Sequence, residues 1–264
     1  MANTIQNKVA EQGEKKTLQA YVKSMEKEIA KALPSVITPE RFTRMVLSAL
    51  SMTPQLKSCT PASFLGAMMS AAQLGLEPNT PLGQAYLIPY KNSGVMEVQF
   101  QIGYKGLIDL AYRSGEIEVI QAHAVHENDR FEVEYGLEPK LIHVPADKDR
   151  GAVVKYYAMF KTKSGGFGFE VMSAEEIAEH AKKYSKSFSS SFSPWKTSFD
   201  EMAKKTVLKK VLKYAPLKSD FVKAVAQDET IKTEISEEMY TVNDETVYDP
   251  EYKEVNTETG EVSA

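Results

Sequence analysis

Lysines and aromatic residues interleave between residues 182 and 213, and this stretch is the part of the sequence best suited to binding chemistry. It holds nine lysines, two acids and five aromatic residues, with six serines between Tyr184 and Pro194. Lysines bind phosphates, and aromatic rings stack on unpaired bases, which contributes about 1 to 3 kcal/mol per base. The pattern therefore favours a single-stranded nucleic acid. The aromatic spacing of three or four residues also fits rings in a core, and for Trp195 both interpretations remain open.

The helical half of the stretch, predicted from Pro194 to Tyr214, places lysines on one side. At about 100° per residue, Lys205, Lys209 and Lys213 form a stripe opposite an apolar arc. Such a stripe can be a solvated face, but Lys209 has only lysines four residues away, and this repulsion favours a phosphate partner. Lys204 falls within the apolar arc, where it can extend outward or mark the approach of DNA or another subunit.

A second basic element is the helix predicted after a strand pair, with Lys105 and Arg113 on it. Gln99 and Gln101 lie on the polar face of the preceding strand, where amides can contact phosphates or bases. The residues predicted to bind DNA are Gln99, Gln101, Lys105, Arg113, Trp195, Lys204, Lys205, Lys209, Lys210 and Lys213.

The sequence lacks the residues that several other chemistries require. A phosphate-binding loop of the G-x-x-x-x-G-K-[ST] type does not occur, which disfavours a recombinase-type ATPase. The four histidines show no metal-ligand spacing, and the single Cys59 cannot form a thiolate zinc site. Asp249 and Glu251 resemble the carboxylates of a nuclease, but they lie in an acidic tail where chance matches are expected. We therefore expect no catalytic residue, metal or cofactor.

The net charge of −4 combines two opposite parts. Residues 226–264 hold 12 acids and two lysines, a net charge of −10, so the rest carries +6. A basic body suggests a polyanionic partner, and an acidic tail is often flexible and can compete for the basic surface or recruit a protein. No apolar run is long enough for a membrane helix, and no signal peptide is evident, so a cytoplasmic protein is expected.

The elements that must position these residues form an α+β pattern: a small antiparallel sheet with a central helix, flanked by N-terminal and C-terminal helices. Helices are predicted at 17–33, after Thr38, after Thr60, at 104–114, after Ser173 and at 194–214, and strands at 85–90, 95–102, 117–126, 130–135, 140–144, 153–161 and 168–172. We expect a disordered segment at 1–16, a DNA-binding and oligomerisation core at 17–225, and a flexible acidic tail at 226–264.

Several motifs together resemble the RecT family of phage single-strand annealing proteins. They are QLGLEP at 73–78, LGQAYLIP at 82–89, QIGYKGLIDL at 101–110 with RSG at 113–115, GLEPKLIH at 136–143, and PW at 194–195 with EMAKKT at 201–206. The resemblance covers residues 30 to 225 in order.

The resemblance implies ATP-independent annealing of complementary DNA strands in phage-type recombination. It also implies homo-oligomeric rings or helical filaments, binding of single strands and the annealed duplex, and a partner 5′→3′ exonuclease. Its small sheet and central helix match the strand–strand–helix order predicted at 85–114.

Residue spacing alone predicts only a protein that binds single-stranded DNA. Three other functions remain open: a passive single-strand-binding protein, a metal-dependent nuclease, and a scaffold whose lysines contact acidic partners.

Overall fold

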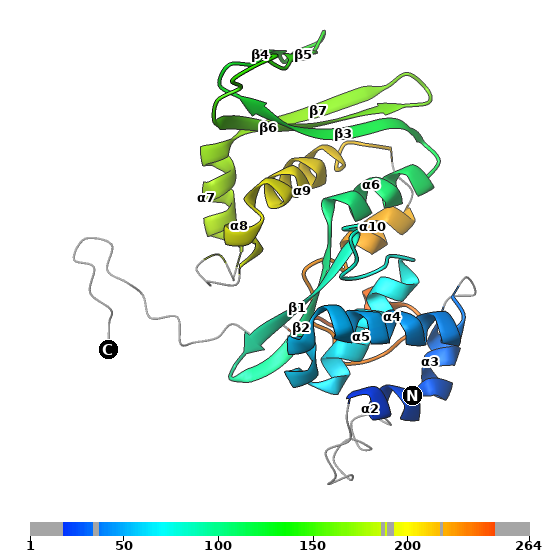
Figure 1. Ribbon diagram of the computed structural model, residues 1–264. Coiled ribbons are helices and arrows are strands. Elements are labelled where there is room, and N and C mark those ends of the chain that lie inside the picture. The colour runs from blue at the N-terminus through cyan, green and yellow to red at the C-terminus, as the bar shows by residue number, and fades with distance from the viewer. Residues whose placement is uncertain (1–17, 34–36, 186–187, 189–192, 217–218, 246–264) are drawn as a thin grey trace, which may run out of the picture. The chain divides into compact units, whose positions relative to one another are not determined.

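The computed structural model describes residues 18–33, 37–185, 188, 193–216 and 219–245, which form helices and small antiparallel sheets (Figure 1). The fold is α+β, as predicted. The chain divides into two compact units: residues up to 102 together with those from 226, and residues 103–225. The predicted disordered segment at 1–16 lies outside the described residues.

The helices of the first unit are α2 (Leu18–Ser24), α3 (Glu26–Ala32), α4 (Pro39–Met52), the 3₁₀ turn η1 (Pro54–Ser58) and α5 (Pro61–Gln73). The single helix predicted at 17–33 is wrong, because Met25 leaves helical geometry between α2 and α3. Thr38 caps α4 by accepting the Arg41 amide, whereas the Thr60 hydroxyl contacts the Ser63 hydroxyl instead. Every residue of α5 from 63 to 72 is buried, so α5 is the core of this unit.

Strands β1 (Ala85–Asn92) and β2 (Val95–Ile102) form an antiparallel hairpin in the first unit. Its turn needs Ser93 and Gly94 at positive φ, which glycine adopts without strain. On β2, Val98, Phe100 and Ile102 are buried, as their alternation predicts.

Residues 226–245, here called the C-terminal strap, complete the first unit and include η2 (Met239–Thr241). Thr230 bridges to Phe100 on β2, and the Asp228 carboxylate accepts the Ile102 amide at 2.7 Å. The Gln73 side chain of α5 donates to the Ser236 and Glu237 carbonyls and accepts from the Met239 amide. The prediction of a flexible tail is therefore wrong for 226–245, and residues 246–264 lie outside the described part.

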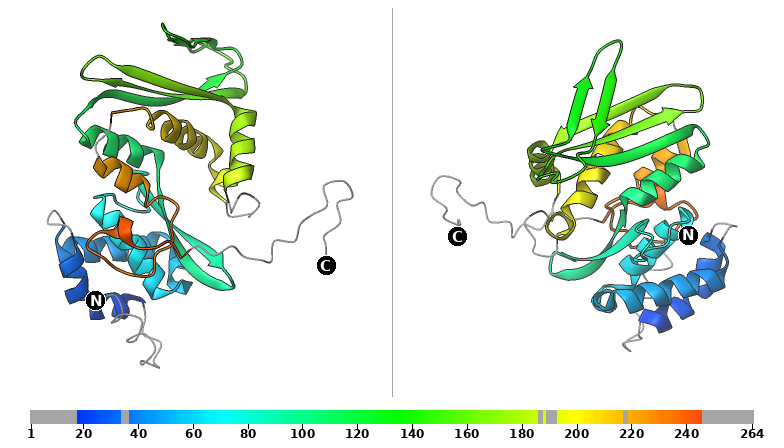
Figure 2. Two further views of the ribbon diagram at one scale, coloured as in Figure 1. Left: turned by 180° about the vertical axis from the view of Figure 1, so that it is seen from behind. Right: turned by 45° about the horizontal axis from the view of Figure 1, so that its top comes forward.

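The second unit is built on the antiparallel sheet β3–β6–β7, with bounds β3 (Ile117–His126), β6 (Val153–Thr162) and β7 (Phe167–Ser173). Its helices are α6 (Tyr104–Arg113), α7 (Ala174–Tyr184), α8 (Pro194–Thr197), α9 (Phe199–Val211) and α10 (Ser219–Val225). Helix α9 lies along one face of the sheet (Figure 2), and the predicted central helix at 104–114 is α6, which packs against α9. The long helix predicted at 194–214 is interrupted at Ser198 and ends after Val211.

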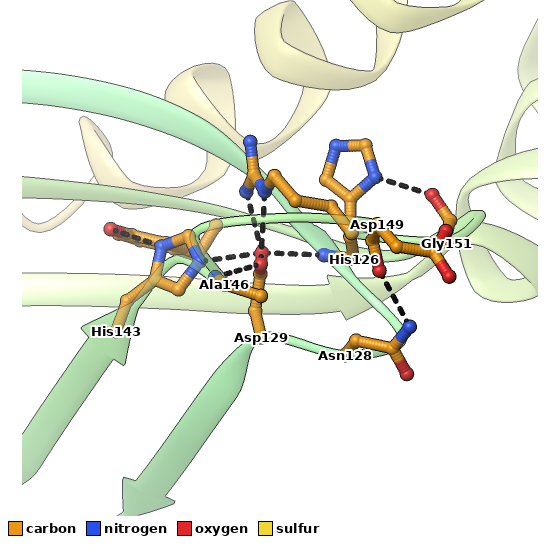
Figure 3. Close-up of polar contacts among 9 residues, drawn as sticks. His126, Asn128, Asp129, His143, Ala146, Asp149 and Gly151 are labelled. Atoms are coloured by element: carbon orange, nitrogen blue, oxygen red, sulfur yellow. Dashed lines mark hydrogen bonds and ion pairs between the residues drawn. The ribbon is translucent and has the colours of Figure 1, made fainter.

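A buried carboxylate fixes the base of the hairpin β4 (Arg130–Glu134) and β5 (Lys140–Val144) in the second unit. Asp129 accepts hydrogen bonds from the Arg150 guanidinium, the His143 ring and the backbone amides of His126 and Ala146 (Figure 3). The Arg150 hydrogen bond, together with the others, holds the pKa of Asp129 far below its usual range, although burial opposes this shift. The carboxylate thereby ties β3, β5 and the loop that follows β5.

Across the described ranges, no helix is both long and apolar enough to cross a membrane.

Candidate nucleic-acid interface

The lysine stripe predicted on α9 is not an exposed surface along its whole length. Lys205 is only 3% exposed, Lys209 is half-buried and Lys213 is exposed. The stripe is wrong for Lys205, because α9 packs against the sheet and against α6, α7 and α8. A helix that is enclosed on several sides has no broad face exposed to solvent. Lys205 is therefore buried where α9 packs against its neighbours.

Lys204 of α9 contacts an aromatic ring on α6. The Lys204 ammonium lies 5.6 Å from the centroid of the Tyr104 ring and 3.8 Å from the Glu201 carboxylate. Lys105, next to Tyr104, is exposed. Burial lowers the pKa of His123 on β3, and the charges of His143 and Lys204 lower it further. Lys204 of α9 and Tyr104 of α6 thus lie side by side, and the Lys204 side chain keeps 22% of its surface exposed.

Two other predicted cations have acidic neighbours. Lys210 lies 3.6 Å from the Glu170 carboxylate of β7, and Arg113 pairs with Asp109 one turn earlier on α6. Lys209 and Lys210 are in the last turn of α9, where positive charge also complements the helix dipole. These residues have structural roles whether or not a phosphate is bound.

Two predicted residues, Trp195 and Gln101, are buried, and the side chain of a third, Gln99, is engaged in a hydrogen bond. The Trp195 side chain is 8% exposed, and its ring centroid lies 5.8 Å from that of Phe199, so the core interpretation of this ring is the one that the fold supports. Gln101 is buried, and the Gln99 amide donates to the Glu229 carbonyl at 3.2 Å. Both glutamines belong to the first unit, whereas the lysines above belong to the second.

The first residues of the lysine-rich stretch are exposed, in contrast to Trp195. Lys182, Lys183 and Tyr184 end α7, and the Tyr184 side chain is 64% exposed. Tyr104 and Tyr184 were absent from the predicted site. The available signal was their position: each tyrosine is adjacent in sequence to a lysine.

Comparison with known proteins places this arrangement in a family. A sequence profile of the RecT family matches residues 40–245, which include the second unit, the C-terminal strap and the first unit from α4 onward. Protein RecT of Escherichia coli (strain K12) is 41% identical over 210 residues, covering 78% of this chain and 77% of that protein. Uncharacterized protein YqaK of Bacillus subtilis (strain 168) is 31% identical over 197 residues, covering 74% of this chain and 66% of that protein. This chain therefore belongs to the RecT family, and that membership supports a role in single-strand annealing during DNA recombination.

Proposed function

We propose that this protein binds single-stranded DNA through its phosphates and anneals complementary strands without ATP. The observation that carries the proposal is the concentration of positive charge in one part of the second unit. Residues 182–225 hold eleven lysines and three acids. Lys105 of α6 is an exposed lysine of the same unit. Phosphate contacts of this kind position a strand without selecting a sequence, which an annealing protein requires.

Annealing sets a second requirement, because the base edges of a bound strand must remain free to pair. Lysines that hold phosphates leave those edges exposed, whereas a protein that enclosed the bases would block pairing. Lys105, Lys204, Lys209 and Lys213 are the proposed phosphate contacts, and Lys105 and Lys213 are the two exposed ones. Gln99, Gln101, Trp195 and Lys205 are withdrawn from this proposal because of their burial or their contacts.

The proposed oligomer follows from the length of the substrate, whereas the proposed nuclease partner is what the resemblance to the RecT family implies. Two strands side by side need a long positive surface, which a ring or filament of many copies supplies. A 5′→3′ exonuclease would generate the single strands in the cytoplasm, and the annealed duplex would remain bound until release.

Salt dependence of binding tests the phosphate contacts. For single strands, the slope of log K against log salt is about −0.7 per phosphate neutralised. Replacing both Lys105 and Lys213 with alanine should therefore make the slope shallower by about 1.4 if each lysine contacts one phosphate. Lys148→Ala with Lys163→Ala is the matched control, because both lysines are exposed in loops of the same unit. An unchanged slope in the first variant, or an equal change in the control, contradicts the assignment.

A further inference from the structure

Helix α7 ends in an aromatic ring that the fold leaves outside its core. Ile177 and Ala181 of α7 are buried, and Tyr184 continues the same helical spacing, so its position in the sequence predicts a core residue. Its side chain is nevertheless 64% exposed. Burying an aromatic ring of this size in the core would stabilise the fold. Because the ring is exposed instead, it is available to a ligand.

The surroundings of Tyr184 are basic and aromatic. The Lys183 ammonium lies 5.2 Å from the ring centroid, and the His180 ring lies 4.7 Å away at an interplanar angle of 45°. The helix is held at its start by a capping box, in which Ser173 and Glu176 bond each other's backbone amides. Tyr184 is at the other end of this helix, where Lys183 and His180 lie beside its ring.

A second exposed tyrosine follows a lysine at the end of α9. Tyr214 is 81% exposed, and its amide donates to the Val211 carbonyl at 3.1 Å, so the backbone that carries the ring is fixed. Lys213 before it is exposed as well. Lys183–Tyr184 and Lys213–Tyr214 thus repeat one arrangement, a cation beside a solvent-facing ring, while the tryptophan of the same stretch is buried.

We infer that Tyr184 and Tyr214 stack on unpaired bases of a bound DNA strand, with Lys183 and Lys213 on the adjoining phosphates. The inference rests on the proposed function, and it assigns base contact to tyrosines that a strand can reach. A planar face accepts any base, so such contacts add affinity without sequence preference. Because stacking uses the face of a base and leaves its edge free, it is compatible with annealing.

The test measures binding of fluorescently labelled oligothymidylate and of an abasic strand of equal length. Each tyrosine-to-alanine change should weaken binding to oligothymidylate about 5-fold or more and leave binding to the abasic strand unchanged. Tyr184→Phe and Tyr214→Phe should keep wild-type affinity, because the ring is retained. Tyr135→Ala is the control, since Tyr135 is 63% exposed and its ring packs on Phe169 at 5.3 Å.

The outcomes separate the two proposals. If the wild-type protein binds neither strand, the proposed function fails. If it binds and the Tyr184→Ala Tyr214→Ala variant binds oligothymidylate equally well, only the stacking inference is overturned. Equal weakening on the abasic strand also overturns it, because the contact would then not involve bases. Unchanged Trp195 emission in the variants verifies that the fold of the second unit is intact.

Discussion

Gly66 lies in the middle of α5, and for its replacement by alanine two physical effects predict opposite changes in the free energy of unfolding. An alanine Cβ at this position would lie 2.0 Å from the Lys232 carbonyl oxygen and 2.8 Å from its carbon, closer than the 3.0 Å below which real Cβ atoms essentially never occur. Helix propensity alone predicts that Gly66→Ala stabilises the protein by about 1 kcal/mol. The contact predicts the reverse, because the C-terminal strap must move by roughly 1 Å or more to admit the methyl group.

The cost of this movement follows from what anchors the strap. The Lys232 ammonium donates to the Met239 carbonyl and, at 2.7 Å, to the Val242 carbonyl, and these bonds would be strained when the backbone of Lys232 shifts. Overpacking costs about 1 to 3 kcal/mol, and a lost hydrogen bond to a charged group costs about 1.5 to 3 kcal/mol. After the propensity gain of about 1 kcal/mol is subtracted from the sum of these two costs, a net loss of about 1.5 to 5 kcal/mol remains.

Urea unfolding followed by circular dichroism measures this loss, and hydrogen exchange locates it. Gly66→Ala should lower the free energy of unfolding and speed amide exchange in residues 226–245. Ala62→Gly on the same helix is the control, and it should cost about 1 kcal/mol through propensity without changing exchange in the strap. A Gly66→Ala protein that is more stable than wild type, or whose strap keeps its protection, would refute the reasoning.

Three further outcomes are expected. Lys232→Met should lower the free energy of unfolding by about 2 to 4 kcal/mol, because two buried carbonyls lose a charged donor; a loss below about 0.5 kcal/mol in urea unfolding would contradict this. Asp129, whose pKa is depressed in the fold, should contribute stability that is complete above its ordinary pKa of 3.8 and lost as pH falls below it. Urea unfolding between pH 2 and 6 should show a steeper acid loss for wild type than for Asp129→Asn, and parallel curves would argue against that contribution. Trp195, the only tryptophan, should emit at short wavelength in the folded protein, shift to the red on unfolding, and stay inaccessible to acrylamide; ready quenching would mean that its ring is exposed.

Sequence reasoning succeeded where a local pattern determines local structure. Ser173 and Glu176 form the predicted capping box, and the residues of 117–126 form the predicted strand. The Ser93–Gly94 turn between the first two strands is also as expected, because few residues adopt positive φ.

The predictions failed where packing from distant segments decides. Helical periodicity places Lys205 opposite the apolar arc, but it cannot show that a helix will be covered on several sides. In the strap, acidic composition suggested a flexible tail, whereas Ile231 and Met239 are buried in the first unit. Lys204 illustrates the intermediate case: the sequence allowed it to extend outward, and the Tyr104 ring that it contacts could only come from the fold.

Annealing is measured most directly by following duplex formation between two complementary strands, one carrying a donor fluorophore and the other an acceptor. We expect the protein to accelerate pairing equally with and without ATP, and replacement of both Lys105 and Lys213 with alanine to slow it. A protein that binds both strands but leaves the pairing rate at its protein-free value would be a passive single-strand binder. That result, or a requirement for ATP, would contradict the proposed ATP-independent annealing.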